Sequence, residues 1–293
     1  MPVTIFHDRD GVRLAYQRRR GDTPVVVLHG GSGRRQHGEA LLPLLPEACD
    51  VVIPDLRGHG ESSHTPGHYQ LEDFAADAAS LCDSVFSGEP AIIYGHSFGG
   101  QVALVLAAGR PDLARAVIIG DTPLSLGSLQ QATAASHEVA GTWRALAASR
   151  RSAQDISAAL EDMTVPAMDG SGDMRPAREV FGAGHPYFAE LGACLATHDP
   201  AFLDEVVLAR FASTHRSLDV SLLSRFTAPV LLVRADPAAG GLLSAREAQQ
   251  AQELRQGVET VIIPGVSHGL HLQDPAGVAA VINPFIEPLI ARQ

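Results

Sequence analysis

The chain has 293 residues, of which 45% are hydrophobic and 19% are charged, a balance that suits one folded α/β domain and excludes a disordered protein. The net charge of −11 argues against nucleic acid or an anionic membrane surface as a partner, because either would need a basic patch. The three cysteines have no paired spacing and no apolar stretch could span a bilayer, so we expect a cytoplasmic protein without a disulfide framework.

Strand patterns begin at the N-terminus. Residues 1–6 alternate like a strand and precede a hairpin turn, which indicates structure rather than a signal peptide. Residues 24–28 form a β-branched run that ends in the glycine loop HGGSG at residues 29–33, and residues 51–54 lead into the sequence DLRGHGES. Short apolar runs of this kind predict buried strands that deliver polar residues to one edge of a sheet.

The most informative stretch is GHSFG at residues 95–99, directly after the apolar run 91–94. Glycines two residues on either side of Ser97 are needed at a tight strand-to-helix turn, because side chains there would collide. Residues 100–108 are typical of the helix that follows, whose positive end points at the serine. We therefore predict that Ser97 is a nucleophile.

Three further strands are predicted downstream, and each is followed by an aspartate or a histidine, which are common catalytic residues. They are residues 116–119 before Asp121, residues 230–233 before Asp236, and residues 258–263 before His268. Open α/β sheets build their sites at the C-terminal ends of their strands. The sequence therefore predicts that these side chains gather near Ser97.

Together, the strand-HGG segment, DLRGHGES, GHSFGG, the late aspartate and the C-terminal GVSHGLHLQDP resemble the α/β-hydrolase superfamily. The resemblance implies an α/β fold with a mostly parallel sheet flanked by helices. It implies a core of residues 1–121 and 227–293, with a helical cap of residues 122–226 inserted after the sixth strand. Apolar residues at three- and four-residue spacing within 136–148, 153–163 and 202–211 favour helices in this cap.

A serine hydroxyl needs a base to take its proton, and His268, in the loop after the last predicted strand, is the candidate. His271 lies three residues further on and suits a rim position better. An acid must hold the imidazole in one tautomer. Asp236 stands where the family usually places this acid, although the usual glycine-containing turn is replaced by RADP at residues 234–237, and Asp121 is the alternative.

The resemblance also implies an oxyanion hole made by the backbone N–H groups of Gly31 and Phe98. No motif identifies the residues that line the substrate pocket. Each candidate has two interpretations, contact with the substrate or packing of the cap against the core. The candidate substrate-binding residues are Gly30, Trp143, Phe181, Tyr187 and Phe188. The histidines of the cap are ambiguous between substrate contact and plain surface positions: His137, His185, His198 and His215.

Other histidines are interpreted as structural. His29 and His59 lie in glycine-rich loops and are expected to brace them, and His96 is expected to pack beside the turn. His64 and His68 are four residues apart, but no carboxylate completes a site, so we expect no metal and no other cofactor.

The sequence thus predicts a serine hydrolase that cleaves a small or medium carboxylic ester or lactone through an acyl-enzyme intermediate. The same triad also serves thioesters, amides and carbon–carbon bonds between carbonyls. A prolyl-type aminopeptidase would need acidic residues in the cap, and Glu161, Asp162, Glu179 and Glu190 leave that reading open. A non-catalytic small-molecule receptor of this fold is the alternative from another class. The expected partner is a small-molecule substrate, and a homodimer remains open.

Overall fold

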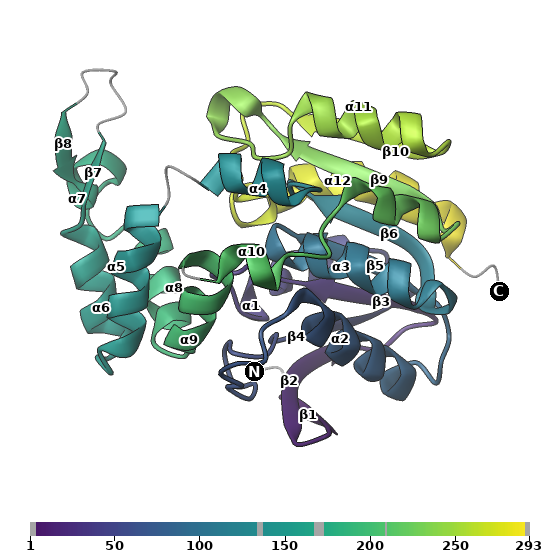
Figure 1. Cartoon of the computed structure of the whole chain (residues 1–293), viewed down its shortest axis with the longest axis horizontal. Coiled ribbons are helices and arrows are strands. Elements are labelled where there is room, and N and C mark those ends of the chain that lie inside the picture. Colours follow the sequence, from purple (N-terminus) through teal and green to yellow (C-terminus); the bar gives the residue numbers. More distant parts are fainter. Residues whose placement is uncertain (1–3, 134–136, 167–172, 209, 291–293) are drawn as a thin grey trace.

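The computed structural model describes residues 4–133, 137–166, 173–208 and 210–290 (Figure 1). Its centre is an eight-stranded sheet in the order β1-β2-β4-β3-β5-β6-β9-β10. Pairing is antiparallel from β1 to β2 and from β2 to β4, and parallel across the rest of the sheet. The strands span Ile5–Arg9 (β1), Val12–Arg19 (β2), Thr23–Leu28 (β3), Cys49–Pro54 (β4), Ala91–His96 (β5), Ala114–Gly120 (β6), Val230–Ala235 (β9) and Val258–Ile263 (β10).

Helices cover both faces of the sheet because its central strands are hydrophobic on both sides. In β3, Val26 and Leu28 belong to one hydrophobic cluster and Val25 and Val27 to the other. The first cluster continues into α2, α3 and α11, and the second into α12. Both faces of a parallel sheet are normally buried in this way. These helices are α1 (Gln36–Glu39), α2 (Leu71–Val85), α3 (Phe98–Gly109), α11 (Ala245–Leu254) and α12 (Pro275–Ile286).

Residues 122–226, here called the insertion, lie between β6 and β9 and extend to one side of the sheet (Figure 1). The helices expected from residues 136 and 153 are present as α5 and α6, but the one expected over 202–211 is broken into α9, a π-helical segment (Leu203–Leu208) and α10. A short hairpin of β7 and β8 was not expected. The elements are α4 (Leu126–Thr133), α5 (His137–Ala148), α6 (Ala153–Glu161), β7 (Thr164–Pro166), β8 (Met174–Pro176), α7 (Ala177–Phe181), α8 (Pro186–Leu195), α9 (Pro200–Phe202) and α10 (Phe211–Thr214).

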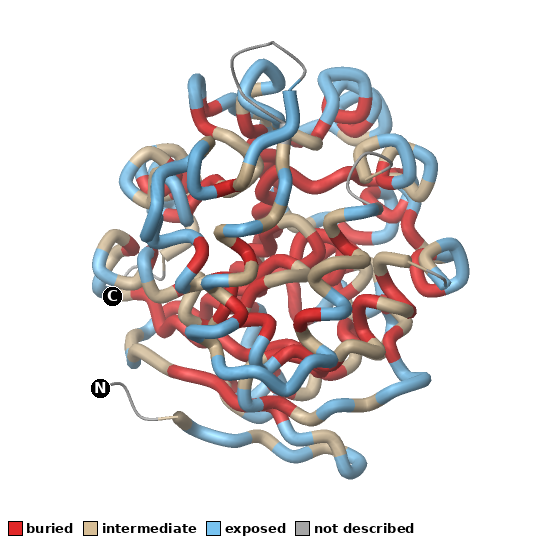
Figure 2. Tube along the Cα trace, turned by 90° about the vertical axis from the view of Figure 1, so that its left-hand side faces the viewer, coloured by how far each residue is buried: buried red, intermediate tan, exposed pale blue. Residues whose placement is uncertain are grey.

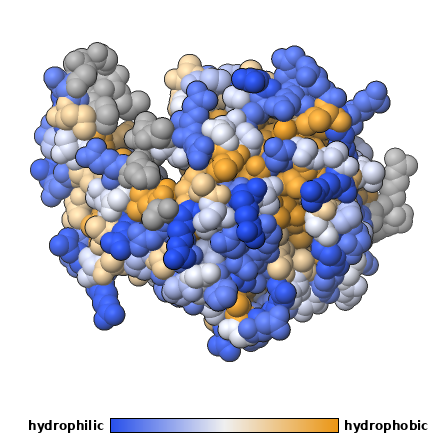
Figure 3. All heavy atoms as spheres, viewed as in Figure 1, coloured by the Kyte–Doolittle hydropathy of each residue, from blue (hydrophilic) through white to orange (hydrophobic). Residues whose placement is uncertain are grey.

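Buried residues run through the middle of the molecule, whereas the hairpin of β1 and β2 lies at the edge (Figure 2). The surface in Figure 3 is mixed, with hydrophobic side chains exposed among hydrophilic ones. No helix in the described part of the chain is long and apolar enough to cross a membrane.

The turn from β5 to α3 packs tightly against neighbouring backbone. A Cβ atom added to Gly95 would lie 2.2 Å from the carbonyl oxygen of Gly99, and one added to Gly99 would lie 2.3 Å from that of Leu28 at the end of β3. Both distances are far inside van der Waals contact, and backbone cannot move aside as a side chain can. Glycine at these two positions therefore lets the turn lie against the end of β3.

Because the turn lies so close to β3, one methyl group added at Gly99 should lower the stability of the fold. We expect Gly99→Ala to lower the free energy of unfolding by about 1–3 kcal/mol or more, the usual cost of overpacking. Gly109→Ala, at the other end of the same helix, is the matched control, since a Cβ there meets no atom within 4 Å. That control should be neutral or gain about 0.5–1 kcal/mol from reduced chain entropy. Urea unfolding of both variants measures the difference, and equal values would contradict the packing argument.

Candidate active site

Ser97 occupies the turn between β5 and α3 with a strained backbone. Its φ of 54° and ψ of −120° are sparsely populated by residues that carry a side chain. Its amide donates to the carbonyl oxygen of Gly120 at the end of β6, 2.9 Å away, which ties the turn to the neighbouring strand. The turn presents Ser97 at the C-terminal edge of the sheet, as the glycines on either side of it predict.

A histidine and an aspartate complete a hydrogen-bonded chain with this serine. The Nε2 atom of His268 lies 3.0 Å from Ser97 Oγ, and its Nδ1 atom lies 2.7 Å from Asp121 Oδ2. A carboxylate can only accept a hydrogen bond, so the ring proton sits on Nδ1 and Nε2 is left to accept the serine proton. The predicted pairing of Ser97 with His268 is present in the structure.

Asp121 follows β6, which lies beside the serine strand in the sheet. Its carboxylate is fully buried and also accepts hydrogen bonds from the amides of Ala235 (3.2 Å), Leu242 (2.9 Å) and Leu243 (3.1 Å). Burial alone would raise the pKa of Asp121. The hydrogen bond from His268 and those from the backbone outweigh burial and hold this pKa below its usual value.

The structure contradicts the first choice for the acid, Asp236. Its two carboxylate oxygens accept hydrogen bonds from the amides of Ala238 (2.9 Å) and Gly265 (2.8 Å). Asp236 thus caps the short turn that follows β9 and closes the loop after β10. The RADP turn at residues 234–237 uses this carboxylate locally, and the alternative acid, Asp121, contacts the histidine instead.

The glycine loop after β3 lies against the serine turn. A Cβ atom added to Gly30 would lie 3.3 Å from Ser97 Cβ, and one added to Gly31 would lie 3.4 Å from Phe98 Cβ. The two backbone segments that are expected to form the oxyanion hole are therefore neighbours. A side chain at position 30 would press on Ser97, so glycine there lets the loop come this close, whereas a Cβ at position 31 would make an ordinary van der Waals contact.

Three buried histidines hold the glycine loop in place. His29 Nδ1 donates to the carbonyl oxygen of Gly30 (2.8 Å), while its Nε2 accepts from the amide of Leu56 (3.0 Å). The carbonyl oxygen of Gly31 lies 3.0 Å from Nε2 of His59 and 2.9 Å from Nε2 of His198. Burial lowers the pKa of all three to about 3, so they are neutral braces at ordinary pH.

Two more histidines stand close to the candidate base. His96 Nε2 donates to the carbonyl oxygen of His268 at 2.7 Å, and burial holds the pKa of His96 well below its usual value. His271 is fully buried with Nδ1 2.9 Å from the hydroxyl of Tyr94, and burial lowers its pKa to about 3. Neither reaches the serine in place of His268, and His271 is a core residue rather than a rim residue.

The aromatic residues proposed for the pocket differ in how far they are buried. Phe188 is buried and Trp143 is half-buried, and both pack into the hydrophobic cluster of the insertion. Phe181 and Tyr187 are exposed at 47% and 48%, and each meets the ring of Phe188 edge-on. Phe181 ends α7, which Figure 1 places at the outer end of the insertion, far from β5 and α3. The roles of these residues in substrate binding stay predictions.

Other residues of the insertion approach the serine turn, and one of them, Phe202, was not predicted from the sequence. Ring atoms of Phe202 lie 3.7 Å from the Cβ position of Gly31, and the rings of Phe202 and Phe98 are 5.3 Å apart. His198, left ambiguous above, reaches the same loop. His215 is also buried, with its ring 6.0 Å from that of Phe98, whereas His185 is exposed and caps α8. The side chain of His137 lies outside the described part of the structure.

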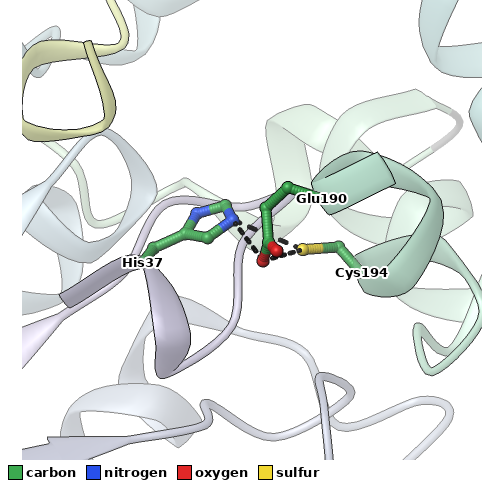
Figure 4. Close-up of side chains that lie close together, drawn as sticks. All are labelled: His37, Glu190 and Cys194. Carbon is green, nitrogen blue, oxygen red and sulfur yellow. Dashed lines mark hydrogen bonds and ion pairs between the residues drawn. The ribbon is translucent and has the colours of Figure 1, made fainter. Parts of the chain in front are cut away.

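Metal-binding side chains gather elsewhere. Within the part of the chain that the structure describes, one group of three could hold a metal ion: His37, Glu190 and Cys194. They come from α1 and α8 rather than from the serine turn (Figure 4).

Known proteins share this architecture. The 2-(acetamidomethylene)succinate hydrolase of Mesorhizobium japonicum is 26% identical over 283 residues, which cover 92% of this chain and 90% of that protein. A thermophilic esterase from Thermogutta terrifontis is 21% identical with a TM-score of 0.69, covering 99% of this chain and 100% of that one. An N-acyl homoserine lactone degrading enzyme is 20% identical with a TM-score of 0.71, covering 96% and 100%. Residues 25–281 match the model of the alpha/beta hydrolase family, and the chain belongs to that family.

Proposed function

We propose that this enzyme is a serine hydrolase that cleaves a small or medium carboxylic ester or lactone through an acyl-enzyme intermediate. One observation carries the proposal: the continuous hydrogen-bonded chain from Ser97 through His268 to Asp121, set on a strained turn at the edge of the sheet. A hydroxyl, an imidazole and a carboxylate in this order are the groups that nucleophilic acyl transfer needs.

In the proposed first half-reaction, Ser97 Oγ attacks the ester carbonyl carbon while His268 Nε2 takes the hydroxyl proton. The carbonyl π electrons move to oxygen, and the backbone N–H groups of Gly31 and Phe98 receive the oxyanion. The tetrahedral intermediate collapses with cleavage of the bond to the leaving oxygen, which takes the proton from the imidazolium. A water molecule then repeats these steps on the acyl-enzyme and releases the acid and Ser97. In a lactone the leaving alcohol stays attached to the acyl group.

Asp121 is the proposed orienting acid of this reaction. Its hydrogen bond keeps the ring proton on Nδ1, and its negative charge stabilises the imidazolium that forms during attack. The three backbone amides that also bind the carboxylate hold it in place and keep it ionised.

The insertion would serve as the cap that selects the substrate, and its contacts favour an ester or lactone over an N-terminal amine. Three of the four acidic residues that an aminopeptidase could use have partners of their own. Glu190 pairs with Arg34, Asp162 with Arg178, and Glu161 accepts the amide of Gly184. The fourth, Glu179, is exposed. Relatives and structural neighbours described as a 2-(acetamidomethylene)succinate hydrolase, an esterase and an N-acyl homoserine lactone degrading enzyme support hydrolysis of small acyl compounds.

A fluorophosphonate probe tests the nucleophile. It should label Ser97 covalently, and Ser97→Ala should abolish labelling and lower kcat on aryl esters or lactones by several orders of magnitude, since the attacking atom is gone. The same panel should include thioesters, β-diketones and aminoacyl amides to identify the bond that is cleaved. Labelling that persists in Ser97→Ala would refute the assignment, and tight ligand retention without turnover in the wild type would indicate a receptor.

The two aspartates should differ sharply in their effect on turnover. Asp121→Asn allows the wrong histidine tautomer and should lower kcat by up to about 10⁴-fold, the size of effect known for such a change in serine proteases. Asp236→Asn weakens only a local turn and should leave kcat within a few-fold of the wild type. Steady-state kinetics on a common ester substrate measure both variants, with circular dichroism to establish folding. The reverse ranking would return the acid to Asp236.

The lowered pKa of Asp121 also predicts a pH effect on stability. A carboxylate whose pKa is depressed in the folded protein contributes stability above its unfolded pKa of about 3.9 and loses it as the pH falls through the folded pKa. The difference in unfolding free energy between wild type and Asp121→Asn should therefore be largest near neutral pH and shrink below about pH 4. Urea titrations from pH 7 to pH 3 measure this difference, and a constant difference would contradict the ionised, hydrogen-bonded state.

A further inference from the structure

Three side chains that the proposed reaction does not use meet where the insertion packs on the core. Glu190 and Cys194 lie one turn apart on the same face of α8, and His37 faces them from α1 (Figure 4). The atoms concerned are His37 Nε2, Glu190 Oε1 and Cys194 Sγ. They are separated by 3.3 Å (Nε2 to Oε1), 3.4 Å (Sγ to Nε2) and 3.7 Å (Sγ to Oε1).

These distances do not describe a good hydrogen-bonded cluster. The separation of Nε2 from Oε1 is longer than the usual range of about 2.7–3.2 Å for an N–H···O bond. A single imidazole nitrogen also faces both the carboxylate and the sulfur, so its one proton can serve only one of these contacts, and the thiol of Cys194 reaches the carboxylate only across 3.7 Å.

The same distances do fit the edges of a tetrahedron around one metal ion. Zinc binds imidazole nitrogen at about 2.0–2.1 Å, carboxylate oxygen at about 2.0–2.2 Å and thiolate sulfur at about 2.3 Å. Ligand atoms at those radii and at tetrahedral angles lie roughly 3.3–3.6 Å from one another. The observed separations of 3.3, 3.4 and 3.7 Å therefore leave room for zinc at the centre with little movement of the side chains.

The surroundings supply the other parts of such a site. Cys194 is 2% exposed, whereas 38% of the Glu190 side chain is accessible, so the group is closed on one side and open on the other. Arg34 binds both carboxylate oxygens of Glu190, Nε to Oε1 at 2.9 Å and Nη2 to Oε2 at 3.0 Å. Outer hydrogen bonds of this kind orient metal-binding carboxylates.

We propose that His37, Glu190 and Cys194 form a zinc site that joins the insertion to the core, with water in the fourth position. A cysteine, a histidine and a carboxylate are ligands that zinc accepts together. His37 lies close behind the glycine loop, because a Cβ atom on Gly33 would be 2.7 Å from His37 Nδ1. The ion fastens α8 beside this loop, and it takes no part in the reaction at Ser97.

Cobalt provides the direct test, because it takes zinc sites and gives a visible spectrum. The full chain, freed of metal with a chelator and kept reduced, is titrated with Co²⁺. We expect one equivalent to bind, with a thiolate-to-cobalt charge-transfer band and the intense visible bands of tetrahedral cobalt. Zinc should displace the cobalt and raise the melting temperature by several degrees, since it binds only the folded site.

Variants separate this site from adventitious binding by other histidines. Cys194→Ser should remove the charge-transfer band, and Glu190→Gln and His37→Gln should each weaken zinc binding at least 100-fold in a competition assay. Cys82→Ser, which removes another buried thiol, is the matched control and should behave as the wild type. The proposal is overturned if the wild type shows no charge-transfer band, if the band survives in Cys194→Ser, or if zinc leaves the melting temperature unchanged. None of these readouts depends on hydrolytic activity.

Discussion

The contact between the β5–α3 turn and the end of β3 is the constraint on which the site depends. Gly99 touches the carbonyl of Leu28 so closely that no side chain fits between them. The same contact places the loop after β3 beside Ser97, so one backbone contact positions both the proposed nucleophile and the expected oxyanion donors. Groups positioned in this way need little reorganisation when charge develops, which is the main source of electrostatic stabilisation in acyl transfer.

The position of the acid follows from which backbone groups can hold a buried charge. Asp121 has a φ of 41°, and its amide donates to Val233 in the adjacent strand. Amides from β9 and from the loop after it then converge on the carboxylate from one side, while His268 approaches from the other. A charge can be buried at low cost only when it is satisfied so completely. Asp236, at the end of the neighbouring strand β9, instead accepts hydrogen bonds from the amides of Ala238 and Gly265.

Most of the core could be predicted from the sequence because its signals are local. The apolar runs at residues 24–28 and 91–94, and the glycines around Ser97, each determine their structure over a few residues. The choice of acid could not be made in this way. Asp121 and Asp236 both follow buried strands, and they differ in which groups their carboxylate oxygens contact. For Asp121, one of these groups is the amide of Leu242, more than a hundred residues further along the chain, whereas Asp236 contacts the amide of Gly265.

The contacts of the insertion were still harder to predict, because helical periodicity shows which face of a helix is buried but not which element covers that face. Phe188 and Tyr187 are neighbours in the sequence, yet one is buried and the other exposed. His37 is likewise more than 150 residues from Cys194, and their contact depends on how α8 docks on the core. Pairings of this kind arise from tertiary packing and leave no trace in local spacing.

The hydrogen bond from His198 to Gly31 has a consequence for motion. The insertion cannot lift off the core without separating His198 from this carbonyl oxygen, which keeps His59 as its other partner. The cost is about 1–3 kcal/mol if water does not replace the partner that His198 loses. Taken alone, such a cost limits a lifted state to between about one molecule in six and about one in 160. The loop that would bind the oxyanion and the segment that would admit the substrate are therefore linked thermodynamically. A ligand that binds the docked state more tightly than the lifted state shifts this equilibrium by the difference between its two binding free energies.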